Sequence, residues 1–192
     1  MARTREFDED TAFEKALEVF WAKGLRGTTM LDLAQATGVQ RGSLYHAYGD
    51  KEEIFVQAFE RYASTFLADA GNSLAKPDLR EALSSFFDVS IRTITKGNPS
   101  RGCLSTKTAF DLDAASPRVA AALKTLIDEL SAIVLAALDT DERKFRLSVS
   151  PERATLLIVA MTRSLGVFER VYADKKVLRR TAQALIDALV RS

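Results

Sequence analysis

The sequence predicts an all-α protein of about nine helices, with a small N-terminal domain (residues 1–50) and a larger helical domain (residues 51–192). Apolar residues recur at helical spacing throughout the chain, and no long alternating pattern of a β-strand appears. Hydrophobic residues make up 47% of the 192 residues, which is enough to bury a sizeable core. We therefore expect helices packed on helices, with a long helix from Asp50 belonging to both domains.

The first helix is expected over residues 10–23. Its apolar residues Phe13, Ala16, Leu17 and Phe20 fall on one stripe, which is typical of a helix that packs on a core. Gly24 should end this helix, because glycine is the residue most often found just past a helix C-terminus.

Two short helices follow. Thr29 and Asp32 form a capping-box pattern ahead of a helix over residues 30–36. Gly38 permits a tight turn, and a second short helix is expected over residues 40–47. Two short helices joined by a turn that contains glycine are typical of a helix-turn-helix.

The larger domain is expected to contain six helices. Asp50 and Asp78 each precede a glutamate at capping-box spacing, and Pro117 and Pro151 each follow a serine, as at the first position of a helix. Gly71 should end the long helix, and residues 97–102 read as a loop. The expected ranges are 50–70, 77–96, 103–112 (ending at Leu112), 117–138 (capped by Ser116), 151–172 and 175–190.

Composition excludes several classes of site. One cysteine, Cys103, and one histidine, His46, allow neither an internal disulfide nor a structural zinc site, so we expect no metal and no cofactor. The first ten residues lack the apolar run of a signal peptide, and no stretch approaches the about 18 apolar residues of a membrane span. We therefore expect a cytoplasmic protein that does not contact a membrane.

The segment over residues 28–55, TTMLDLAQATGVQRGSLYHAYGDKEEIF, resembles the DNA-binding domain of the TetR family. The residues that carry the resemblance, in order, are Thr28, Leu33-Ala34, Gly38-Val39, Gln40-Arg41, Gly42-Ser43-Leu44-Tyr45, Tyr48 and Lys51-Glu52. The resemblance implies a homodimeric transcriptional regulator that binds a pseudo-palindromic operator in double-stranded DNA. It also implies a C-terminal ligand-binding and dimerisation domain, from which a small-molecule inducer releases the DNA. Repression is the leading interpretation, and activation, or a response without a ligand, is the alternative.

The second short helix should read the operator. Val39 and Leu44 are placed to anchor it, which leaves other residues facing outward: Gln40, Arg41, Gly42, Ser43, Tyr45 and His46. Arg41 can contact a guanine with two hydrogen bonds and Gln40 an adenine, while the hydroxyls can reach phosphate or sugar. The alternative is a helical hairpin used only for packing.

Few cations are available to hold phosphate. By resemblance, Thr28 and Lys51 bind phosphates, and Arg3 and Arg5 form a basic arm that enters the minor groove or remains a solvated terminus. Residues 1–51 hold seven Lys or Arg and eight Asp or Glu, a net charge of −1. Binding should therefore depend on the placement of few cations, which dimerisation doubles.

The resemblance places the dimer interface on the last two long helices. Candidate interface residues are Leu156, Val159, Leu178, Ala182, Leu185 and Leu189. The last four repeat on one face of the final helix, although they are also suited to the core of a single chain.

A ligand pocket is expected among the middle helices. Its candidate residues are Phe66, Phe86, Phe87, Cys103, Lys107, Phe110, Asp111, Arg163 and Phe168, each of which has a plain alternative as a core or surface residue. Cys103 stands at a predicted helix N-terminus near Arg101 and Lys107, which should lower the pKa of its thiol. The Gly-Cys-Leu triplet resembles a TetR subgroup in which some members sense electrophiles or oxidants; the alternative is a buried small hydrophobe.

Two other classes of protein are alternatives. A cysteine-based enzyme is not favoured, because His46 lies on the exposed short helix, far from Cys103 in sequence. The chain also contains no nucleophile elbow, P-loop or dinucleotide fingerprint. A helical adaptor that binds only protein is the remaining alternative, and DNA binding distinguishes it from a regulator.

Overall fold

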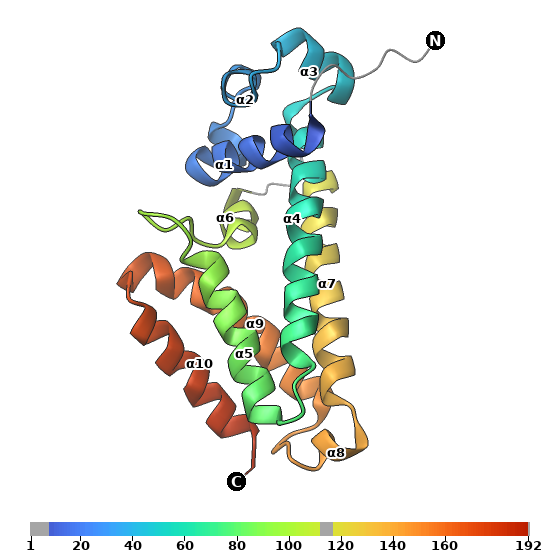
Figure 1. Ribbon diagram of the computed structural model, residues 1–192, viewed down its shortest axis with the longest axis vertical. Coiled ribbons are helices and arrows are strands. Elements are labelled where there is room, and N and C mark those ends of the chain that lie inside the picture. The colour runs from blue at the N-terminus through green and yellow to red at the C-terminus, as the bar shows by residue number, and fades with distance from the viewer. Residues whose placement is uncertain (1–7, 112–116, 192) are drawn as a thin grey trace. The chain divides into compact units, whose positions relative to one another are not determined.

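The computed structural model describes residues 8–111 and 117–191, and in these ranges its regular secondary structure is helical apart from one isolated bridge between Leu147 and Val190. The helices are α1 Glu9–Gly27, α2 Met30–Thr37, α3 Arg41–Tyr48, α4 Lys51–Leu74, α5 Leu79–Ile94, α6 Leu104–Asp111, α7 Pro117–Leu138, α8 Asp141–Lys144, α9 Pro151–Tyr172 and α10 Lys175–Leu189 (Figure 1). The predicted all-α class is confirmed. Arg3, Arg5, Leu112 and Ser116, which the sequence singles out, lie outside the described residues.

The chain divides into two compact units. The first comprises the residues up to Tyr62 together with 107–123, and the second comprises 63–106 together with the residues from Lys124 onward. The helices α4, α6 and α7 therefore each contribute to both units. The boundary in α4 lies later than residue 50 because the first half of this helix packs against α1: Phe20 meets Phe55 at 5.1 Å between ring centroids.

Aromatic contacts form the core of the first unit. Besides the Phe20 contact, Phe13 of α1 packs edge-on against Tyr48 of α3, at 5.4 Å between ring centroids. Trp21 packs in the same way on Tyr62 of α4, at 5.2 Å. Such edge-to-face pairs add to the free energy gained from burying the rings, so α1 fixes α3 and α4 at defined positions.

Gly24 interrupts α1 but does not end it, because the helix continues to Gly27. Gly24 has a φ of +73° and a ψ of 171°, which are not helical, and one further helical turn leads to Gly27. Only glycine adopts this backbone conformation without strain. The hydroxyl of Thr28 donates to the carbonyl of Gly24 at 2.6 Å and closes this irregular helix end.

Two further expectations about helix bounds were wrong. Helix α4 continues through Gly71 to Leu74, because Ser73 and Leu74 are buried and tertiary packing outweighs the low helix propensity of glycine. The short helix α8 was not predicted; it begins where the hydroxyl of Thr140 accepts a hydrogen bond from the Arg143 amide at 3.3 Å. None of the described helices is both long enough and apolar enough to cross a membrane.

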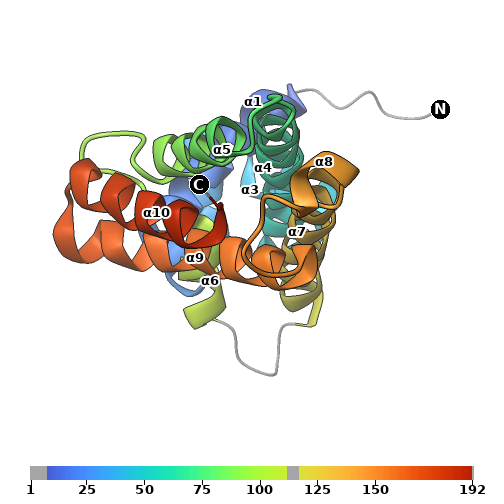
Figure 2. The same ribbon diagram turned by 90° about the horizontal axis from the view of Figure 1, so that it is seen from below.

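In the second unit, α10 packs along α5 and α9 (Figures 1 and 2). The apolar stripe of α10 faces this core, so Leu178, Ala182 and Leu189 are buried within the chain, as is Val159 of α9. These four residues are therefore not free to form the expected dimer interface, because the core of their own chain takes up their apolar surface. Leu185 is half-buried, whereas Leu156 is 70% exposed.

Candidate nucleic-acid interface

The N-terminus of α2 is fixed by the predicted capping box. The amide of Asp32 donates to the Thr29 hydroxyl at 3.2 Å, and the amide of Thr29 donates to the Asp32 carboxylate at 2.9 Å. The ammonium of Lys23 lies 2.5 Å from the same carboxylate. The bonds from Lys23 and Thr29 together lower the pKa of Asp32 to about 2.

A glycine turn sets the direction of α3. Gly38 has a φ of +74° and donates its amide to the carbonyl of Ala34 at 3.0 Å, which ends α2. Val39 follows directly and is buried. Within α3, Leu44 and Tyr48 are buried as well, so one face of the helix is anchored to the core of the first unit.

The opposite face of α3 is exposed and polar. It carries Gln40, Arg41, Gly42, Ser43, Tyr45 and His46, all of which are exposed. The guanidinium carbon of Arg41 lies 6.0 Å from the ring centroid of Tyr45, one turn away. The face combines guanidinium, amide, hydroxyl and imidazole groups, which are the groups that read base edges and phosphates in a major groove.

The contacts of Thr28 and Lys51 differ from the expected binding of phosphate. Thr28 is 1% exposed, and its hydroxyl already donates to Gly24. The ammonium of Lys51 donates to the carbonyls of Leu25 at 2.9 Å, Arg26 at 3.2 Å and Thr28 at 2.9 Å. Since an ammonium has three hydrogens, these bonds use all its donors. Both side chains therefore stabilise the end of α1.

The start of α4 carries an acidic cluster that the sequence did not predict. The guanidinium of Arg118, from the first turn of α7, lies 2.8 Å from Asp50 and 3.5 Å from each of Glu52 and Glu53. Burial alone would raise the pKa of Asp50, but the bond from Arg118 and the amide of Glu53 lower it below its usual value. Arg118 thus offsets negative charge directly after α3, and only the fold brings it there.

Cys103 lies in a second polar cluster. It is 7% exposed, and its sulfur lies 3.2 Å from the hydroxyl oxygen of Ser105, which accepts a hydrogen bond from Arg163 at 2.5 Å. Burial raises the pKa of the thiol, but the Arg163 charge and the Ser105 hydroxyl outweigh burial and bring the pKa below its usual value. The cation that acts on the thiol is therefore Arg163, rather than Arg101 or Lys107 as expected.

The other candidate ligand residues are not gathered around one space. Phe66, Phe86 and Phe87 are buried in the core, and Phe168 packs edge-on against Tyr172 at 5.6 Å. Phe110 is 80% exposed on α6. Lys107 and Asp111, also on α6, lie against the end of α1. The aromatic candidates thus fill the core or face outward, as expected if they are ordinary core or surface residues.

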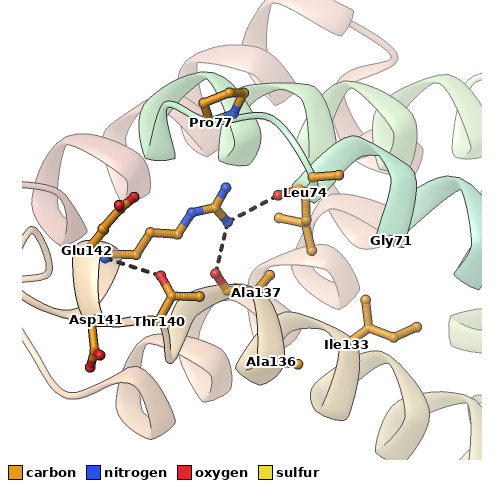
Figure 3. Close-up of a pocket in the computed structure, with 11 residues that line it drawn as sticks. Gly71, Leu74, Pro77, Ile133, Ala136, Ala137, Thr140, Asp141 and Glu142 are labelled. Atoms are coloured by element: carbon orange, nitrogen blue, oxygen red, sulfur yellow. Dashed lines mark hydrogen bonds between the residues drawn. The ribbon is translucent and has the colours of Figure 1, made fainter.

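An open cavity of about 760 Å³ lies elsewhere in the second unit (Figure 3). Leu74 and Ile133 line it, and the guanidinium of Arg143 donates to the carbonyls of Leu74 at 3.1 Å and Ala137 at 2.8 Å. No residue predicted to bind ligand lines this cavity. Across the described ranges, no three His, Cys, Asp or Glu side chains are grouped to hold a metal ion.

Two protein-family models match the chain. The model described as bacterial regulatory proteins, tetR family, matches residues 13–58. The model described as tetracyclin repressor-like, C-terminal domain, matches residues 80–185. The first match covers α2 and α3, and the second covers more than half of the chain.

Curated relatives match over part of their length. The HTH-type transcriptional repressor ComR of Escherichia coli (strain K12) is 30% identical over 125 residues, 64% of this chain and 60% of ComR. The HTH-type transcriptional regulator YezE of Bacillus subtilis (strain 168) is 29% identical over 121 residues, 62% of each chain. The matches thus span about three fifths of these relatives.

Solved structures share the whole fold. A cysteine mutant of the TetR family transcriptional regulator CifR, complexed with 26-bp double-strand operator DNA, superposes with a TM-score of 0.86 at 24% identity. The superposition covers 98% of this chain and all of that one. The reduced form of Escherichia coli NemR gives a TM-score of 0.84 at 15% identity, covering 96% of this chain and 97% of NemR.

Proposed function

The chain belongs to the tetR family of bacterial regulatory proteins, and we propose that it is a transcriptional repressor that binds operator DNA as a homodimer. The observation that carries the proposal is the exposed polar face of α3, which stands on the buried anchors Leu44 and Tyr48. A helix held in this way can enter a major groove with its N-terminal residues against the base edges. The operator complex of CifR, which has the same fold, supports this use of the fold.

Arg41 and Gln40 are the proposed base-reading residues. A guanidinium matches the two acceptors of guanine, and a carboxamide matches the donor and acceptor of adenine. Ser43, Tyr45 and His46 are the proposed contacts to phosphate and sugar. Lys51 and Thr28 support the interface indirectly, by closing the helix end that leads into α2.

Dimerisation is proposed to use the outward face of α9. Leu156, Ala160, Ser164, Val167 and Val171 are spaced three or four residues apart, and all are exposed in the single chain. An exposed helical stripe of apolar and small side chains favours a second helix as its partner. A two-fold pair of chains would present two copies of α3 to a pseudo-palindromic operator.

Release of the operator is proposed to follow binding of a small-molecule inducer or modification of Cys103. The lowered pKa of the Cys103 thiol supports the second route, because the thiolate is the reactive form. Its burial means that a reagent reaches the sulfur only when the surrounding helices open. Either event releases DNA only if it favours a conformation that binds DNA less tightly.

Operator binding is tested with the DNA upstream of the protein's own gene cluster, in a gel-shift titration at several salt concentrations. Arg41→Ala should weaken specific binding by at least about 30-fold, because each of the two copies of α3 loses a bidentate base contact of about 1–3 kcal/mol. Arg92→Ala, which removes an exposed arginine of α5, is the matched control and should bind as the wild type does. Equal binding by the wild type and Arg41→Ala would overturn the assignment of α3 as the reading helix.

The Cys103 route is tested separately. A thiol-alkylating reagent should weaken operator binding by the wild type and leave Cys103→Ser unaffected, since Cys103 is the sole cysteine of the chain. If both proteins lose binding equally, or neither loses it, modification of Cys103 is not a release signal. Small-molecule release would then be the remaining route.

A further inference from the structure

Helix α6 holds the end of α1 through one lysine. The ammonium of Lys107 donates to the carbonyl of Trp21 at 2.7 Å and approaches that of Ala22 at 3.4 Å. These carbonyls belong to the last regular turn of α1 before Gly24 interrupts it. A helix C-terminus carries partial negative charge on its carbonyls, so an ammonium placed there is attracted to the whole helix end.

The same face of α6 packs closely on the interruption. A Cβ atom built on Gly24 would lie 2.7 Å from a carboxylate oxygen of Asp111 and 3.6 Å from the Cε of Lys107. Lys107 and Asp111 are four residues apart and lie on one face of α6. Because Gly24 has no side chain, this face approaches the backbone of α1 directly.

The end of α1 positions the helix-turn-helix. From Gly24 the chain passes through Thr28, which is bonded back to Gly24, to the capping box of α2. Two ammonium groups hold this end. Lys51 donates hydrogen bonds to the carbonyls after the interruption, and Lys107 donates to those before it. Of the two, only Lys107 lies outside the segment of α1 to α4.

We propose that Lys107 is a positioning residue for operator binding, which rests on the proposed function above. Its ammonium fixes the end of α1 and, through it, the orientation of α2 and α3. Lys107 itself contacts no DNA. Helix α6 begins at Leu104, next to Cys103, and its Ser105 accepts a hydrogen bond from Arg163 of α9. Loss of the Lys107 ammonium should therefore free the end of α1 and weaken DNA binding.

The first test measures operator affinity by fluorescence anisotropy. Lys107→Met keeps the aliphatic chain but removes the ammonium, and it should weaken binding by about tenfold, as expected for the loss of charge-assisted hydrogen bonds. Lys107→Arg keeps a cation that can donate to carbonyls and should restore most of the affinity. Lys15→Met, at an exposed lysine of α1, is the matched control and should leave the affinity unchanged.

The salt dependence separates positioning from direct contact. A lysine that binds phosphate contributes about one unit to the slope of log affinity against log salt concentration. Lys107→Met should keep the wild-type slope while the whole line moves to weaker binding. A reduced slope would show that Lys107 contacts DNA, and wild-type affinity in Lys107→Met would show that the contact with α1 is irrelevant; either result overturns the proposal.

A second measurement requires no DNA. Trp21 is the sole tryptophan of the chain, and its own carbonyl accepts the bond from Lys107. The fluorescence emission spectrum of Trp21 should change in Lys107→Met and stay as in the wild type in Lys107→Arg and Lys15→Met. Only variants with a cooperative unfolding transition are compared. If Lys107→Met does not fold, Lys107→Gln takes its place. An unchanged Trp21 spectrum would contradict the contact, whereas a wild type that binds no DNA would overturn the proposed function and the role of Lys107 with it.

Discussion

At the scale of a single residue, the ionisation of Cys103 depends on Arg163. The guanidinium and the Ser105 hydroxyl hold the pKa of the buried thiol below its usual value, although burial acts in the opposite direction. Because the folded pKa lies below the unfolded one, the thiolate stabilises the fold above the unfolded pKa. This contribution is lost as the pH falls through the folded pKa.

Arg163→Met should raise the pKa of Cys103, because burial is then opposed mainly by neighbouring hydroxyls. The rate of alkylation by iodoacetamide, measured from pH 6 to pH 10, should reach its half-maximal value at a higher pH in the variant than in the wild type. Cys103→Ser gives the background rate. A shared midpoint for Arg163→Met and the wild type would mean that Arg163 does not control the thiol.

At the scale of an element, the start of α2 should respond to acid. The bonds from Lys23 and Thr29 lower the pKa of Asp32 to about 2. A carboxyl group with a lowered folded pKa stabilises the protein above its unfolded pKa, and this contribution is lost as the pH falls through the folded value. Asp32→Asn should thus destabilise the first unit at neutral pH, and the difference from the wild type should shrink below about pH 4.

Urea unfolding followed by Trp21 fluorescence, which reports on the first unit, measures this difference at each pH. Asp128→Asn, which breaks an exposed pair with Lys124 on α7, is the control and should have little effect. If the stability lost in Asp32→Asn stays constant from pH 7 to pH 3, the capping carboxylate is not responsible for it.

Local signals determine how well each helix could be predicted. The bounds of α7 and α9 agree with the sequence because a proline at the first position marks each start. The end of α4 was misplaced because burial of Leu74 is a tertiary effect that no local pattern reveals. Helix α8 is only four residues long, too short to show a period.

At the scale of the whole molecule, the outward face of α3 was predictable and its supports were not. The spacing of Val39 and Leu44 reveals the exposed face, because helical period alone sets it. The contacts of Lys51 with α1 and of Arg118 with Asp50 join residues 23 or more apart in sequence. Such contacts depend on the tertiary fold, so a single sequence gives no sign of them.

The exposed stripe on α9 should determine whether the protein dimerises. Leu156 is 70% exposed in one chain, and burial of a leucine side chain contributes about 1.5–3 kcal/mol. A two-fold interface contains each residue twice, so Leu156→Asp should weaken dimerisation by about 3–6 kcal/mol. The dissociation constant of the dimer should therefore rise at least about a hundredfold. Sedimentation equilibrium at micromolar concentration should show a dimer for the wild type and a monomer for the variant.

Phe145→Asp is the matched control for this change. Phe145 is exposed to a similar degree, but it lies after α8 and not on the α9 stripe, so its replacement should leave the dimer intact. Because a pseudo-palindromic operator needs two copies of α3, Leu156→Asp should also lose cooperative operator binding while its α3 remains folded. A dimer that survives Leu156→Asp but dissociates in Phe145→Asp would move the interface away from α9, and the two copies of α3 would then have to be paired by another surface.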